Sequence, residues 1–128
     1  GLKLTEVVAA EIAHGELIRR VAGFFANYDL LICPAVMCPP FPVETRYVEQ
    51  LEGVKLEGYM GWLVMTYALS MTACPILSVP CGFTADGLPI GLQVMAPTRA
   101  EARLFAHGAY LEQLFGLAGR LPIDPVSR

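Results

Sequence analysis

A long run without charged residues constrains this chain more than any other feature. No Asp, Glu, Lys or Arg occurs between Glu57 and Asp86. A run of that length could span a bilayer, but Pro75 and Pro80 would break the helix, and several hydroxyl side chains interrupt it. We therefore expect no membrane span. The run instead predicts a buried helix over residues 60–71, followed by a buried strand.

The clearest local structure is a hairpin. Residues 76–83 and 89–95 are two apolar runs on either side of Asp86-Gly87. Asp-Gly favours a tight turn because glycine adopts positive φ without steric cost. The sequence therefore predicts that the two runs pair as antiparallel strands.

Two further elements and a long connection are expected before this hairpin. Residues 5–27 have helical apolar spacing, with Thr5 as the expected N-cap and Gly15 as a weak point. Residues 30–33 are uniformly apolar, which predicts a short strand buried on both faces. Residues 34–58 contain four prolines early on and predict a long irregular connection.

A last helix is expected after the hairpin. Thr98 and Glu101 have the spacing of a capping box, which predicts the helix start. Gly116 is placed to follow its last turn, and residues 121–128 are expected to form a tail. The expected inward stripe is Leu104, His107, Leu111 and either Leu114 or Phe115. Together these elements predict an α/β fold in which a mixed β-sheet is flanked by helices.

The composition suggests a segment that does not cover all its own apolar surface. Hydrophobic residues make up 55% and charged residues 16%, and the mean hydropathy is +0.50. Typical domains are roughly 45–50% apolar and about 25% charged, so we expect a larger core or self-association. There are 9 Lys+Arg against 12 Asp+Glu and no basic run, which argues against direct nucleic-acid binding. Glu6, Glu11 and Glu16 interrupt the apolar core that a signal peptide needs, so a cytoplasmic location is expected.

The four cysteines, Cys33, Cys38, Cys74 and Cys81, do not have zinc-ribbon spacing. Each lies among apolar residues and prolines. Reduced, buried thiols are favoured over two disulfides, and both over a metal site. We expect no metal and no cofactor.

Several stretches resemble the amidase signature family. Residues 74–95 are similar to its C-terminal hallmark, and residues 24–34 and 40–44 are similar to segments that precede it. Residues 58–62 resemble the helix before the hallmark in the family's general amidases. The match runs in the right order over nearly the whole chain. One departure is Ala73, which stands where the family commonly has Gly and reduces backbone freedom at that bend.

The resemblance implies that the chain is a portion of a larger α/β/α sandwich. It also implies hydrolysis of carboxylic amide C–N bonds, other than peptide bonds, by a Ser–Ser–Lys triad. The family's catalytic residues lie N-terminal to the matched region. Residues 1–128 would then be the C-terminal segment of an amidase domain, with the large N-terminal catalytic part absent.

No catalytic residue is assigned within this chain. It has no adjacent serine pair and no Gly-Gly-Ser run. Its serines and lysines are Ser70, Ser78, Ser127, Lys3 and Lys55. We therefore expect the chain alone to be inactive, with the N-terminal part of the amidase as its partner.

The expected contribution of this segment is a wall of the pocket for a small-molecule amide substrate. Pro34, Ala35 and Val36 follow the end of a predicted strand, where ligands gather in open α/β sheets. Trp62 is the fourth expected wall residue, although it could equally be a core aromatic. His107 is interpreted as a packing residue.

Two other functions stay open from the sequence. One is the A subunit of a tRNA-dependent amidotransferase, although Trp62-Leu63 favours a general amidase. The other is a non-enzymatic assembly module that uses an apolar face.

Overall fold

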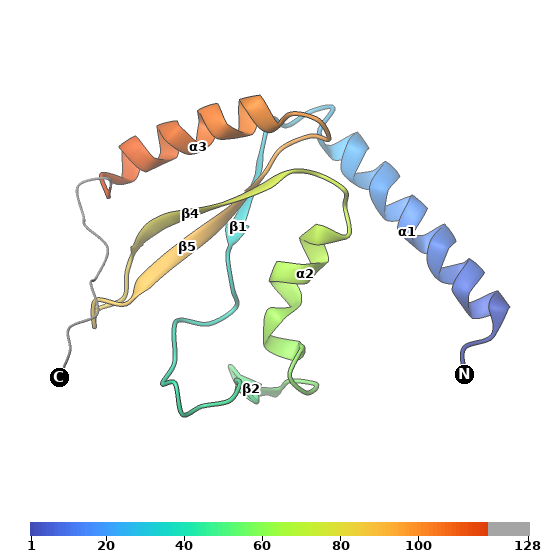
Figure 1. Cartoon of the computed structure of the whole chain (residues 1–128), viewed down its shortest axis with the longest axis horizontal. Coiled ribbons are helices and arrows are strands. Elements are labelled where there is room, and N and C mark those ends of the chain that lie inside the picture. The colour runs from blue at the N-terminus through green and yellow to red at the C-terminus, as the bar shows by residue number, and fades with distance from the viewer. Residues whose placement is uncertain (118–128) are drawn as a thin grey trace.

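The computed structural model describes residues 1–117. The predicted tail over residues 121–128 lies outside this range. Three helices, one 3₁₀ turn and five strands make up the described chain (Figure 1). In chain order they are α1 (Leu4–Phe24), β1 (Leu31–Pro34), β2 (Gln50–Leu51), β3 (Val54–Lys55), η1 (Gly61–Leu63), α2 (Val64–Ser70), β4 (Ile76–Phe83), β5 (Pro89–Met95) and α3 (Glu101–Phe115).

The sheet has three strands in the order β1-β5-β4. Both pairings are antiparallel, and Val94 at the centre lies opposite Ile32 on one side and Leu77 on the other. The α/β class expected from the sequence is confirmed, although the strand pairings of the described residues are all antiparallel. One irregularity, between Pro80 and Gly82, leaves Cys81 as the extra residue of a β-bulge.

The predicted hairpin is confirmed with the predicted bounds. Its turn closes with a hydrogen bond from the Gly87 N–H to the Thr84 carbonyl at 2.9 Å. The Thr84 N–H donates to the Leu88 carbonyl, and the Thr84 Oγ1 accepts from the Leu88 N–H. Gly87 has φ +81°, the left-handed conformation that made Asp-Gly a turn signal.

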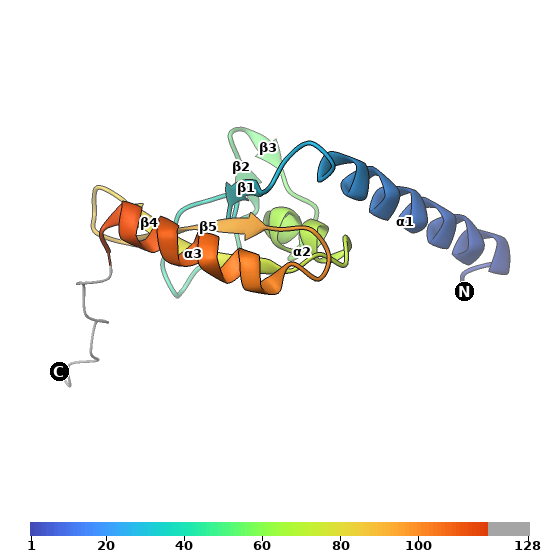
Figure 2. The same ribbon diagram turned by 90° about the horizontal axis from the view of Figure 1, so that it is seen from above.

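The core lies between α3 and one face of the β4–β5 pair (Figures 1 and 2). Its fully covered members are Val79, Val94, Ala96 and Leu104. Leu111 and Phe115 complete the inward stripe of α3, whereas Leu114 is exposed. Gly108 permits the close approach of α3, because a Cβ there would overlap the Leu77 side chain of β4.

The expected burial of the charge-free helix is wrong. The segment forms η1 and the short α2, and neither contains a buried residue. One side of α2 is bonded to the sheet, because the Met65 carbonyl accepts from Gln93 and the Thr66 hydroxyl donates to the Ala35 carbonyl. On the other side, Tyr67 and Met71 are 39% and 48% exposed. An all-apolar helix is buried only where a layer covers each side, and the described chain covers one side.

Burial of the first strand on both faces is also wrong. Ile32 is 47% exposed, because β1 is an edge strand and α3 lies over β4 and the adjoining part of β5. In the connection after β1, the structure adds a small hairpin of β2 and β3 that was not predicted. Its turn residues Glu52 and Gly53 have φ +48° and +79°. The signal for this hairpin in the sequence was the Glu-Gly dipeptide, which stands between two apolar residues, Leu51 and Val54.

Both predicted N-caps are wrong, although the helices exist. α1 begins one residue early, and Glu6 accepts a hydrogen bond from the Lys3 N–H at 2.7 Å, which leaves Thr5 inside the first turn. α3 begins at Glu101 with Ala100 as its N-cap. Thr98 instead lies beside Cys74, with 3.7 Å between Oγ1 and Sγ.

Two glycines of the helices behave differently from each other. Gly15 does not interrupt α1, which runs over 21 residues. Gly116 ends α3 in the left-handed conformation, φ +64°, as predicted.

No helix of the described residues is long and apolar enough to cross a membrane.

Ala73 holds a strained conformation between α2 and β4. Its φ is +57°, in the left-handed region that costs an L-residue roughly 1–2 kcal/mol. This is the position where glycine was expected from the family resemblance, so the substitution by alanine is accommodated with strain.

Ala73→Gly should therefore stabilise the chain by about 0.5–1 kcal/mol, since relief of the strain exceeds the added entropy of the unfolded chain. The matched control is Ala109→Gly on the exposed side of α3, which should destabilise by about 1 kcal/mol. Urea unfolding of both variants measures the difference. A loss of stability in both would show that Ala73 is not strained.

Candidate functional site

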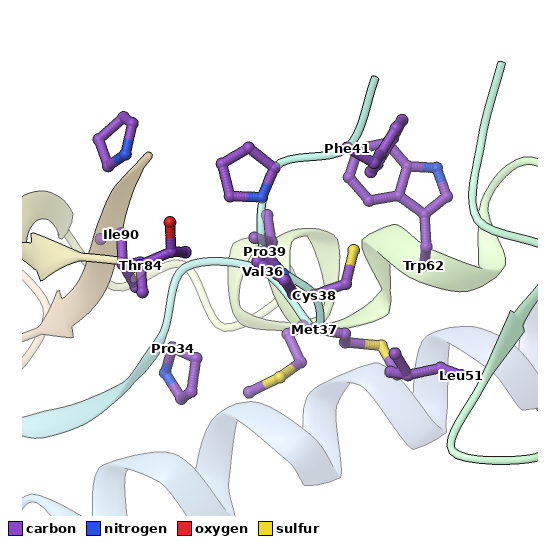
Figure 3. A pocket seen from close by; sticks show the side chains of 14 residues that line it. Pro34, Val36, Met37, Cys38, Pro39, Phe41, Leu51, Trp62, Thr84 and Ile90 are labelled. Atoms are coloured by element: carbon purple, nitrogen blue, oxygen red, sulfur yellow. The ribbon is translucent and has the colours of Figure 1, made fainter. Parts of the chain in front are cut away.

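A cavity of about 820 Å³ lies beside the end of β1 (Figure 3). It lies on the same side of the sheet as α2, opposite α3, and Figure 1 shows these two helices on opposite sides of the sheet. It is formed by the connection after β1, by η1 and α2, and by the tip of the β4–β5 hairpin. The residues that line it are Pro34, Val36, Met37, Cys38, Pro39, Pro40, Phe41, Leu51, Trp62, Met65, Thr84, Pro89, Ile90 and Gly91. Its size falls within the range of about 300–1,000 Å³ that small-molecule pockets occupy.

Three of the four expected wall residues reach this cavity. Pro34, Val36 and Trp62 line it, and Ala35 does not. The Ala35 N–H donates to the Gly91 carbonyl at 2.9 Å, which extends the β1–β5 pairing by one residue. The Ala35 carbonyl accepts from the Thr66 hydroxyl at 3.0 Å. Through these two backbone hydrogen bonds, Ala35 joins the cavity wall to β5 and to α2 without lining the cavity itself.

Gln93 is the residue that sequence reasoning missed. It is 6% exposed, and its side-chain Nε2 lies 3.3 Å from the Pro34 and Ala35 carbonyls and 3.2 Å from the Met65 carbonyl. These carbonyls belong to the connection after β1 and to α2, so a single amide joins two sides of the cavity to β5. The signal available in the sequence was a lone amide inside an otherwise apolar strand, since a buried polar group requires partners.

A row of aromatic rings begins at the end of the cavity that lies away from the tip of the β4–β5 hairpin (Figure 3). The rings of Phe41 and Trp62 meet edge to face at 5.3 Å between centroids, with an interplanar angle of 81°. The ring centroids of Tyr59 and Trp62 lie 6.5 Å apart, and those of Tyr47 and Tyr59 lie 5.8 Å apart. The Trp62 Nε1 is buried and has no hydrogen-bond partner among the described residues.

Gly61 allows Trp62 to sit in this row. A Cβ at Gly61 would lie 2.9 Å from the Leu56 Cβ, which is closer than real Cβ atoms approach one another. Any other residue here would therefore push η1 away from the connection and displace Trp62. The glycine before the tryptophan is a packing requirement of the cavity wall.

The cavity has the chemistry of a binding surface. Its lining contains no charged side chain, and its hydrogen-bonding side-chain groups are the Thr84 hydroxyl and the Cys38 thiol, besides the covered indole nitrogen. Burial raises the pKa of the Cys38 and Cys33 thiols above that of an ordinary cysteine, which favours the neutral thiol and makes both poor nucleophiles. Ser78 lies against Gly91 on the sheet, and the Ser70 hydroxyl donates to the Thr66 carbonyl.

The other residues singled out from the sequence have no arrangement for catalysis or metal binding. His107 is on α3, across the sheet from the cavity, and its Nδ1 is buried without a partner among the described residues. The four cysteines are free thiols but only partly buried, so full burial was wrong. Within residues 1–117, no group of three or more His, Cys, Asp and Glu side chains could hold a metal ion.

Comparison with known proteins identifies the class. Residues 4–105 match the model of the family described as Amidase, so the chain belongs to the amidase family. It is 34% identical over 120 residues to the acylamidase of Rhodococcus erythropolis, a match that covers 93% of this chain and 25% of that protein. It is also 40% identical over 92 residues to the A subunit of the Glutamyl-tRNA(Gln) amidotransferase of Salinispora tropica, covering 72% of this chain and 17% of that protein.

Solved structures agree with this assignment. A bacterial aryl acylamidase of the amidase signature enzymes superposes with a TM-score of 0.76 at 26% identity, covering 94% of this chain and 26% of that one. The chain thus spans about a quarter of the length of the acylamidases it matches. The fold expected from the resemblance is confirmed.

Gln93→Leu should destabilise the chain by about 1–3 kcal/mol, because it removes the side-chain donor to the Pro34 and Met65 carbonyls, whereas the Ala35 carbonyl keeps the Thr66 hydroxyl. It should also shift the emission of Trp62, the sole tryptophan, toward longer wavelength as the wall loosens. The control is Gln113→Leu on the exposed side of α3, which should change neither property. Equal effects of the two substitutions on Trp62 emission would contradict the role of Gln93 in the wall.

Proposed function

We propose that this chain is the C-terminal segment of an amidase and forms one wall of its substrate pocket. The observation that carries the proposal is the cavity beside the end of β1, lined by Pro34, Val36 and Trp62 within the region matched to the family. The substrate class is a carboxylic amide, whose C–N bond the intact enzyme hydrolyses. The wall binds the substrate away from water, so that the amide is held in position for attack.

The reacting groups lie outside this chain in the proposal. The family resemblance supplies a Ser–Ser–Lys triad, in which a serine attacks the carbonyl carbon while a lysine takes up its proton. Ser70 and Ser78 are not adjacent in the sequence. The Ser70 hydroxyl donates to the Thr66 carbonyl, and Ser78 lies beside Gly91 on the sheet. The neutral Cys38 thiol belongs to the binding wall and does not act as a nucleophile.

Amide hydrolysis should therefore require the rest of the enzyme. The purified chain should show no turnover of simple aliphatic and aryl amides above buffer, since loss of the catalytic unit in a serine hydrolase removes on the order of 10⁶-fold of rate. A chimera in which this chain replaces the matched quarter of the Rhodococcus erythropolis acylamidase should hydrolyse the same panel.

A matched pair of substitutions separates folding from function in the chimera. Trp62→Ala should lower kcat/KM, whereas Tyr110→Ala on the exposed side of α3 should not. Repurified chain that still turns over amide would refute the assignment of catalysis elsewhere. A folded chimera without activity, or one equally affected by both substitutions, would refute the role as a pocket wall.

A second candidate is the A subunit of a tRNA-dependent amidotransferase. The 40% identity to the Salinispora tropica protein supports it. In that case the protein containing this chain would copurify with partner subunits, and its glutaminase activity would depend on tRNA. A general amidase would show neither property.

The exposed apolar surface supports a further proposal, that the isolated chain self-associates. Figures 1 and 2 both show the N-terminal half of α1 projecting from the rest of the molecule. Leu4, Val8 and Ile12 form an exposed apolar stripe there. Such surface favours association.

Sedimentation equilibrium at micromolar concentration should show species heavier than 13.9 kDa. Val8→Lys combined with Ile12→Lys should reduce their mass, because charge on the stripe opposes its burial. A single ideal species at the monomer mass, without binding of a hydrophobic dye, would show that the chain covers its own core. Strong association together with an inactive chimera would favour the hypothesis of a non-enzymatic assembly module.

A further inference from the structure

The wall of the cavity differs in character from one end to the other. At one end lie the edge-to-face rings of Phe41 and Trp62, and at the other lie Thr84 and Ile90 of the hairpin (Figure 3). Met37 and Cys38 lie between these ends (Figure 3). The polarity of the lining is therefore confined to a hydroxyl, a neutral thiol and a covered indole nitrogen.

We infer that this wall selects amides that carry an uncharged aryl group, and that Phe41 and Trp62 are the residues that receive the ring. The inference rests on the proposed function and names the substrate class of the same cavity. Aromatic rings prefer edge-to-face or offset contacts at centroid distances of about 4.5–7 Å. Phe41 and Trp62 both line the cavity, and their rings lie at such a distance from each other, 5.3 Å with an interplanar angle of 81°.

The aromatic end is organised before any ligand binds. Tyr59 contacts Trp62 edge to face, and Tyr47 contacts Tyr59 in the same way, so that Trp62 belongs to a row of rings. Gly61 and Leu56 fix the approach of η1 to the connection. A wall already in its binding conformation loses little side-chain entropy on binding, which favours a rigid planar ligand.

Charge gives an independent argument for the same substrate class. A zwitterion such as glutamine carries a carboxylate and an ammonium, and each loses solvation when it enters an apolar cavity. The lining offers no Asp, Glu, Lys, Arg or His to compensate either group. Burial raises the pKa of Cys38, so its thiol supplies no charge near pH 7. This wall therefore disfavours glutamine and favours an uncharged aryl amide.

The test uses the complete 128-residue chain and its single tryptophan, Trp62, as the reporter. The chain is titrated with acetanilide, with acetamide, which lacks the ring, and with L-glutamine. Emission is excited at a wavelength where tryptophan alone absorbs, and calorimetry supplies the dissociation constants. We expect acetanilide to bind about tenfold or more tightly than either other ligand.

Phe41→Ala should weaken acetanilide about 3–10-fold, the range that corresponds to the loss of one aromatic contact. Phe105→Ala is the matched control, because Phe105 is 64% exposed on α3 and does not line the cavity. Phe41→Leu keeps most of the apolar volume without the ring, so it gives the same information if the alanine variant does not fold. It should weaken acetanilide while leaving acetamide unchanged.

The outcomes separate the two levels of proposal. Binding of L-glutamine as tight as that of acetanilide would overturn the aryl selectivity and leave the cavity as an amide pocket. Equal weakening by Phe41→Ala and Phe105→Ala would overturn the assignment of the ring to Phe41 and Trp62. If none of the three ligands binds, the cavity is not a substrate pocket, and the proposed function fails with the inference.

Discussion

The double pairing of β5 is the interaction on which both sides of this structure depend. Its alternating side chains turn Val94 toward α3 and the core, and Gln93 toward the opposite face, where its amide meets three carbonyls of the cavity wall. Because side chains alternate with a period of two, a register shift by one residue would put Gln93 into the apolar core and Val94 under the wall. The bulge at Cys81 and the Gly87 turn help to define this register.

The parts of the fold that the sequence predicted are those determined by local chemistry. The Asp-Gly turn defines the hairpin, and Gly116 ends α3 because it accepts a left-handed conformation. Burial was predicted poorly because it depends on layers far away in the sequence. The apolar pattern of residues 64–70 is that of a covered helix, yet nothing in the described chain packs on its outer side. The predicted N-cap of α3 failed for a local reason, since Arg99 with φ +64° redirects the chain between Thr98 and the start of α3.

The candidate site was predictable in position but less so in detail. A proline-rich connection after an apolar strand indicated the wall, and Pro34, Val36 and Trp62 line the cavity. Ala35 does not, because its N–H continues the pairing with Gly91 and its Cβ lies beside that residue. Gln93 could not be assigned from one sequence, because its partners are backbone carbonyls. Carbonyls are present at every residue, so no pattern of side chains shows where they will gather.

The absence of charge from the lining connects these observations to function. In the function that we propose, a wall without charge would contribute to selectivity by leaving polar groups of the wrong ligand unsolvated, independently of where the nucleophile lies. The same apolar composition leaves α2 and the N-terminal half of α1 uncovered in this chain. Binding surface and uncovered surface thus have one physical origin. A chain can be too apolar to cover itself and still be suited to form one side of a pocket, because both properties follow from side chains that have no favourable interaction with water.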